Sequence, residues 1–366
     1  MPVRRPSSKG FYNSLKAHEH RYDIGTVTSQ LSRVSKNRVK KLGDSLAGYM
    51  QSNVPGTVNR REGLSDYRTN PYVLITSATL MDLSDPQRFA EFLFNNKLYM
   101  GLETSFGKSI EGILVSEYPI GASKAHRWTE PNEKIAESKA LVGLDREDKA
   151  KRRTVSVWRE IDKSCIAGNH RYLATIKSGP NCINDTQVEA MKNAIADHHE
   201  TWMKMTRKNH PGVNRIDIVI GLTYGTDRTT NNKENQILVK LLEHGFEEED
   251  RTRKPGVLID SESRSIRVYR HIGQDFWGFI GNPTSPSKAS FVYLEVLLAL
   301  SEALSKGLGT REFEDNVNRK LAQLSDAISK LAFPRKRLPS WIRKGFSEDE
   351  LFLLATAMTA FFDEGI

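Results

Sequence analysis

RIDIVIGLTY, residues 215–224, is the most continuous run of strand-forming residues in the chain. Its isoleucines, valine and leucine leave few polar positions, which is typical of a strand that is buried on both faces of a sheet. Upstream, TVSVWREI (154–161) and RYLATIKS (171–178) predict two further strands joined around Ala167-Gly168-Asn169. The chain therefore contains the strands of a central sheet.

Helices alternate with these strands. The expected downstream elements are a helix over 184–208 capped by Asn184 or Asp185, a short helix near 235–242, and strands near 257–260 and 265–269. From Ser290 onward the pattern is helical. This order predicts an α/β fold, a mixed central β-sheet flanked by helices, with helical N- and C-terminal extensions.

The charge of the chain is basic. Lys and Arg number 54 and Asp and Glu 45, a net charge of +9 over 366 residues. Phosphates attract such a surface, and binding releases their condensed counterions, so the charge favours a nucleic-acid partner.

The two cysteines, Cys165 and Cys182, are too few for a disulfide framework or a four-ligand zinc site. The N-terminus MPVRRPSSKG has no apolar segment of the secretory kind, and the longest apolar run is too short to cross a bilayer. We expect a cytoplasmic protein without a membrane partner.

The predicted hairpin carries the residue types of a phosphodiesterase site. Asp162 ends the first strand and Lys177 ends the second. A carboxylate can bind Mg2+, and a nearby ammonium can hold the attacking water and offset charge on the phosphate. The main-chain oxygen of Ile176 would be a further metal ligand. A turn aspartate and a strand-edge lysine without catalytic role give the same spacing, which is common.

A second acid is expected two residues before the lysine, where this chain has Thr175. Two glutamates are candidates to replace it. Glu111 lies on an upstream helix in FGKSIEG, and Glu189 lies about one turn into the helix that follows Lys177. Each is equally consistent with a solvated helix surface, so we keep both as metal and catalytic candidates.

Two polar loops near these strand ends suit contacts to phosphates and base edges. One follows Lys177 and the other follows the strand at 215–224; ordinary polar loops would look the same. The candidate DNA-binding residues are Ser178, Asn181, Asn184, Arg228, Asn231, Asn232 and Lys233.

Five segments occur in the order of a known enzyme group: GLETSFGKSIEGI, VWREID, ATIKSGPNCIND, HPGVNRIDIVIGLTYG and DFWGFIGNP. Together they resemble Type II restriction endonucleases of the PD-(D/E)xK superfamily that cut interrupted palindromes with a GGNCC or CCNGG core. The resemblance covers roughly residues 70–282.

The resemblance implies that Asp162 and Lys177 are catalytic and that Glu111 stands at the position of an upstream helix acid. Glu189 stands where related enzymes with a displaced acid supply their second carboxylate. The resemblance also implies Mg2+, double-stranded DNA as substrate, and a homodimer. A cognate DNA methyltransferase is implied as a functional counterpart in a restriction-modification system, not as a physical partner.

The sequence thus predicts a site-specific endodeoxyribonuclease in three segments. These are a basic, partly helical extension (1–70), the nuclease core (71–285), and a helical region for dimerisation or DNA clamping (286–366). Thr175 favours one alternative, a non-catalytic DNA-binding protein on a nuclease fold. A structure-selective repair nuclease is the other.

Overall fold

The computed structural model describes residues 24–362, with gaps at 60–62, 68–69, 84, 143–144, 146, 149–155, 180–181, 227, 250–255, 308–310 and 332–334. Its contacts divide the chain into two compact units. The described residues of unit 1 are 24–43 and 109–301, and those of unit 2 are 44–108 and 302–362.

Neither unit is continuous in sequence, because three helices contribute residues to both: α3 (Lys36–Asn59), α5 (Pro86–Ser109) and α11 (Val292–Gly307). The three consecutive segments expected from composition do not coincide with these units. Shifts in composition divide the chain along its sequence, whereas each unit groups backbone segments that lie close together in space.

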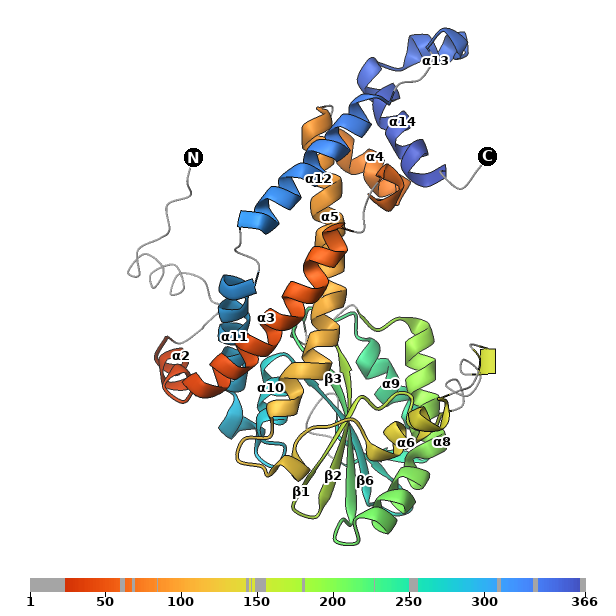
Figure 1. The fold of residues 1–366 in the computed structure, drawn as a ribbon. Coiled ribbons are helices and arrows are strands. Elements are labelled where there is room, and N and C mark those ends of the chain that lie inside the picture. The colour runs from red at the N-terminus through yellow and green to blue at the C-terminus, as the bar shows by residue number, and fades with distance from the viewer. Residues whose placement is uncertain are drawn as a thin grey trace. The chain divides into compact units, whose positions relative to one another are not determined.

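Unit 1 contains a six-stranded mixed sheet in the order β1-β2-β3-β6-β5-β4. Figure 1 labels β1, β2, β3 and β6 of this sheet. Strands β2, β3 and β6 run parallel, and the other neighbours are antiparallel. The strands are β1 (Lys163–Ala167), β2 (His170–Lys177), β3 (Arg215–Leu222), β4 (Phe246–Glu248), β5 (Leu258–Asp260) and β6 (Ile266–Ile272). The predicted α/β class with a mixed sheet is confirmed.

The first predicted strand is wrong. Of residues 154–161, those that the structure describes form a turn, and β1 begins only at Lys163. Trp158 is fully buried, and the Trp202 ring nitrogen donates to the Val157 carbonyl at 3.1 Å. Val157 and Trp158 therefore pack against the helix that carries Trp202 and do not lie in the sheet. The predicted turn at Gly168, whose φ is +62°, is confirmed.

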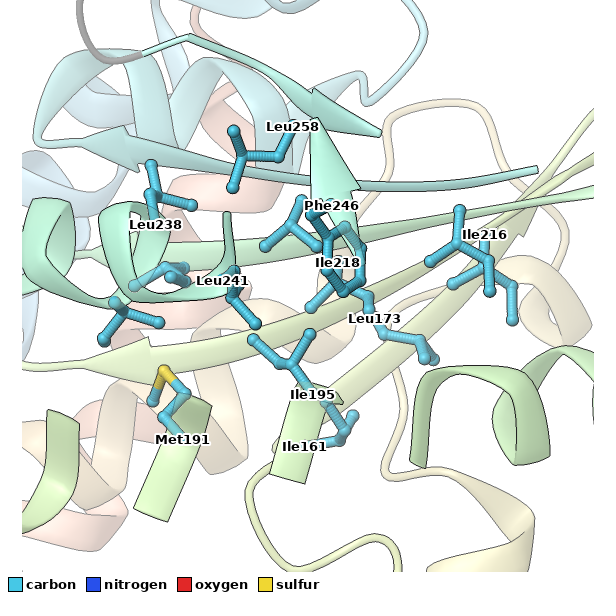
Figure 2. Packing of buried hydrophobic residues seen from close by; sticks show 14 of the residues in the cluster. Ile161, Leu173, Met191, Ile195, Ile216, Ile218, Leu238, Leu241, Phe246 and Leu258 are labelled. Atoms are coloured by element: carbon cyan, nitrogen blue, oxygen red, sulfur yellow. The ribbon is translucent and has the colours of Figure 1, made fainter. Parts of the chain in front are cut away.

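Helices cover both faces of the sheet. On one face α8 (Asp185–Asn209) and α9 (Lys233–Leu241) bury an apolar core against the strands, with Met191 and Leu238 facing Leu173 and Ile218 (Figure 2). On the other face α10 (Gln274–Gly281) packs Phe279 on Tyr172 and Tyr269. Asn184, one of the two predicted capping residues, caps α8 in a reciprocal capping box with Gln187.

The remaining short and long helices are α2 (Ile24–Leu31), η1 (Leu64–Tyr67), α4 (Pro71–Leu80), η2 (Ile110–Leu114), η3 (Val115–Glu117), η4 (Lys124–His126), α6 (Asn132–Ala140), η5 (Pro286–Ala289), α12 (Arg311–Ser329), η6 (Arg335–Arg337), α13 (Ser340–Gly345) and α14 (Glu348–Phe362). Unit 2 is helical and has its own core, in which Phe89 meets Phe352 and Tyr67 meets Phe94. Within the described ranges, every helix is too short or too polar to span a membrane.

A buried ion pair links α6 to the hairpin of β1 and β2. Arg171 on β2 donates to both carboxylate oxygens of Glu133 at 3.0 and 2.8 Å, and its guanidinium lies over the Trp158 ring. Burial raises the pKa of Glu133, but Arg171 outweighs burial and lowers it to about 2. The stabilisation is therefore complete above the usual glutamate pKa and is lost as pH falls towards 2.

We expect Glu133→Gln to lower the free energy of unfolding by roughly 3 kcal/mol, because it leaves a buried arginine without its counter-charge. Urea denaturation near neutral pH measures this. Glu189→Gln, which removes an exposed ion pair, is the matched control and is expected to unfold like the wild type. Equal midpoints for the Glu133 variant and the wild type would show that the pair contributes nothing.

Candidate active site

The candidate site lies where the parallel strands end. Lys177 is the last residue of β2 and stands in register with Leu222 of β3. On the other side of the hairpin, Lys163 pairs with Ala174, so Asp162 lies one step further, beside Thr175. The expected proximity of Asp162 and Lys177 is thus met by a different route, because Asp162 precedes β1 instead of ending a longer strand.

Two hydrogen bonds fix Asp162. Its backbone N–H donates to the Ala174 carbonyl at 2.9 Å, and its carboxylate Oδ2 accepts from the Ile176 N–H at 2.7 Å. The carboxylate is therefore held against the strand that ends in Lys177. Ile176, whose main-chain oxygen is the expected metal ligand, bonds to Asp162 through its N–H and directly precedes Lys177 in the chain.

Glu111 joins them from a distant part of the chain. It lies on η2, a π-helical turn that continues α5, and its side chain is half-buried. Burial raises the pKa of Glu111, and the negative charge of Asp162 raises it further, while Lys177 lowers it in part. These interactions place the three groups in one electrostatic environment. A π-turn is a frequent feature of functional sites because it re-aims a side chain.

Two further lysines surround the carboxylates and were not identified from the sequence. Lys163 begins β1; burial lowers its pKa, against the charges of Glu130, Asp162 and Glu111. Lys134 on α6 donates to the Ile161 carbonyl at 2.7 Å, directly before Asp162. The sequence could have indicated Lys163, because it directly follows Asp162. Nothing in the sequence indicates Lys134, which only the fold brings close to Asp162.

Glu189 is directed elsewhere. It forms ion pairs with Lys240 of α9 and, at 3.4 Å, with Lys192 of its own helix. The hydrogen bond with Lys240 lowers the pKa of Glu189, whose side chain is 48% exposed. Of the two candidate acids, Glu189 thus pairs with a lysine of α9, whereas the charges of Asp162 and Lys177 act on Glu111.

Thr175 is buried, and its hydroxyl oxygen has no hydrogen-bond partner among the residues that the structure describes. It lies on the same face of β2 as Lys177, two residues away. The position of the usual acid is thus occupied by a small polar side chain beneath the site, and a buried hydroxyl of this kind can bond to a water molecule.

The predicted DNA-binding residues divide by their contacts. Several fasten the loops to one another: Asn231 donates to the Ile183 carbonyl at 2.9 Å, and Lys233 pairs with Asp185. Asn232 is left-handed, with φ of +62°, at the start of α9. Among the others, Asn184 caps α8, Ser178 contacts Cys182 at 3.1 Å, Arg228 is exposed, and Asn181 lies outside the described residues.

A known enzyme family shares the hairpin and the elements that follow it. Residues 149–303 match the family of the Type II restriction endonuclease EcoO109I. The match spans less than half of the chain; it contains Asp162, Lys177 and all of β3, while Glu111 lies outside it. It supports a Type II restriction endonuclease, a class of hydrolases that cleave double-stranded DNA. No curated protein sequence matches the chain.

Proposed function

We propose that this protein is a Type II restriction endonuclease that hydrolyses phosphodiester bonds of double-stranded DNA at a short interrupted palindrome with a GGNCC or CCNGG core. One observation carries the proposal. Asp162 and Lys177 lie near the carboxyl edge of the sheet, their charges both act on Glu111, and both lie in the segment that resembles the endonuclease family.

The donor set fits Mg2+. Glu111 and Asp162 offer carboxylate oxygens, and the main-chain oxygen of Ile176 is a further ligand. Among the residues that the structure describes, no cluster of three or more His, Cys, Asp or Glu is placed to hold a metal. Mg2+ does not require such a cluster, because one or two carboxylates with substrate phosphates and waters commonly bind it.

The chain's own residues then have distinct tasks. Mg2+, when bound, supplies positive charge that polarises the scissile phosphate. Asp162, fixed by the Ile176 N–H, and Glu111 define where that charge lies. Lys177 donates a hydrogen bond that orients the attacking water, and its ammonium offsets negative charge developing on the phosphate.

Two identical subunits would each cut one strand. A palindrome has two-fold symmetry, which a symmetric homodimer matches most simply. A cytoplasmic enzyme of this kind would work alongside a cognate DNA methyltransferase that modifies the same sequence.

A digestion of plasmid DNA tests the proposal. With Mg2+ we expect discrete fragments, and with EDTA none. Nicking that follows DNA structure instead of sequence would favour a repair nuclease. Binding without cleavage across a Mg2+ titration would favour the non-catalytic DNA-binding protein, for which Thr175 at the position of the usual acid is the supporting observation.

Affinity for DNA should depend steeply on salt. The net charge of +9 favours many phosphate contacts. If six to ten phosphates are contacted, affinity is expected to fall by roughly a thousandfold or more between about 50 and about 200 mM salt, through counterion uptake. Fluorescence anisotropy with a labelled duplex measures the slope. A nearly flat dependence would contradict a binding mode based on phosphates.

A further inference from the structure

Tyr224 lies at the edge of the site, two residues past the end of β3. Leu222, the last residue of β3, stands in register with Lys177. Although aromatic, Tyr224 is 44% exposed. Its ring covers Gly179: a Cβ added at Gly179 would lie 2.3 Å from Cζ and 2.4 Å from the hydroxyl oxygen of Tyr224. The phenol thus sits on the turn that directly follows Lys177.

The backbone that carries Tyr224 is held on several sides. Thr223 donates from its N–H to the Lys177 carbonyl at 3.0 Å and from its hydroxyl to the Ser178 carbonyl at 2.8 Å. The Trp277 ring nitrogen donates to the Thr223 carbonyl at 2.8 Å. These bonds of the neighbouring residue hold the backbone at Tyr224 next to the end of β2.

A tyrosine in this position suits one ligand, the sugar–phosphate backbone of DNA. The ring presents an apolar face to a deoxyribose, and the neutral hydroxyl can donate to a phosphate oxygen. We propose that Tyr224 contacts the DNA backbone beside the bond that is cut and positions the scissile phosphate against Lys177. The inference rests on the proposed nuclease function and adds to it a residue that touches the substrate.

Gly179 has a matching role. Any side chain there must displace the phenol, since the closest atoms belong to the Tyr224 side chain and not to backbone. A methyl group at Gly179 is therefore a way to move the hydroxyl without removing it. Gly179 and Tyr224 form one contact, and their substitutions should not be additive.

The experiment compares Tyr224→Phe, Gly179→Ala and the double variant with wild type, using linear plasmid DNA. Tyr72→Phe, at a tyrosine that is 82% exposed outside unit 1, is the matched control. Affinity is measured in EDTA, cleavage in single turnover with Mg2+, and melting temperature without DNA.

We expect Tyr224→Phe and Gly179→Ala each to weaken binding by about three- to tenfold and to slow cleavage by a similar factor. The melting temperature of Tyr224→Phe and the salt slope of its binding should stay unchanged, because a neutral hydroxyl releases no counterion. The double variant should resemble Gly179→Ala, since the hydroxyl is already displaced.

Wild-type affinity and cleavage by Tyr224→Phe would overturn the inference, as would an effect of equal size in Tyr72→Phe. A lower affinity that appears only together with a lower melting temperature would also overturn it, by assigning the tyrosine to packing. If wild type binds DNA and does not cut it, the proposed nuclease function fails, while the affinities still decide whether Tyr224 contacts DNA.

Discussion

Lys177→Met is expected to slow DNA cleavage by between about a hundredfold and about ten-thousandfold, because it removes the group that orients the water and offsets charge on the phosphate. Asp162→Asn should have an effect of at least that size. Its amide oxygen can still accept from the Ile176 N–H, so the hairpin keeps its structure while the metal loses a charged ligand. Single-turnover cleavage with Mg2+ measures both rates.

Binding separates catalysis from folding in this test. Both variants should bind plasmid DNA within about threefold of wild type, since two residues among many contacts are changed. Lys204→Met, at an exposed lysine of α8, is the control and should cut normally. Cleavage by either site variant at a rate close to wild type would remove these two residues from the mechanism.

Glu111→Gln and Glu189→Gln should differ sharply, although both make the same chemical change. We expect Glu111→Gln to slow cleavage by at least about a hundredfold. Substituting a residue that only holds a metal ligand in place can already cost about that much, and a direct ligand should cost no less. Glu189→Gln should cut like wild type, because that carboxylate pairs with Lys240 and Lys192. Rates across a Mg2+ titration measure the contrast.

Stability gives a second reading of Glu111. Burial, followed by the charge of Asp162, raises the pKa of Glu111, so the folded state holds this proton more tightly than the unfolded state. Stability therefore falls as pH rises from the ordinary glutamate pKa through the raised one. Glu111→Gln removes that penalty and should melt at a higher temperature than wild type in EDTA near neutral pH. Lower stability together with normal cleavage would contradict the assignment.

Strands β2 and β3 and the turn at Gly168 were accessible from the sequence because their signals are local. Lys177 follows from the end of β2, whereas Asp162 was assigned to the end of a strand that the described residues of 154–161 do not form. The false strand at 154–161 shows the limit of such signals. Buried positions at Trp158 and Ile161 give the same pattern whether they pair in a sheet or pack against a helix.

The choice of acid required the fold. Glu111 and Asp162 are far apart in the sequence, and only the fold brings Glu111 within range of the charge of Asp162. The orientation of Glu189 depends on where α9 presents Lys240, which spacing within α8 does not report. Lys134 and Tyr224 were not predicted for the same reason. Each lies near the site through a contact with a residue distant in sequence, Lys134 with Ile161 and Tyr224 with Gly179.

Sequencing the ends of the fragments produced from plasmid DNA in Mg2+ tests the central claim most directly. If Glu111, Asp162 and Lys177 form the site of a Type II restriction endonuclease, every end should map to one short two-fold-symmetric sequence, and Lys177→Met should yield no such ends in the same time. Ends at unrelated sequences would contradict this claim, and so would DNA that stays intact although the wild-type protein binds it.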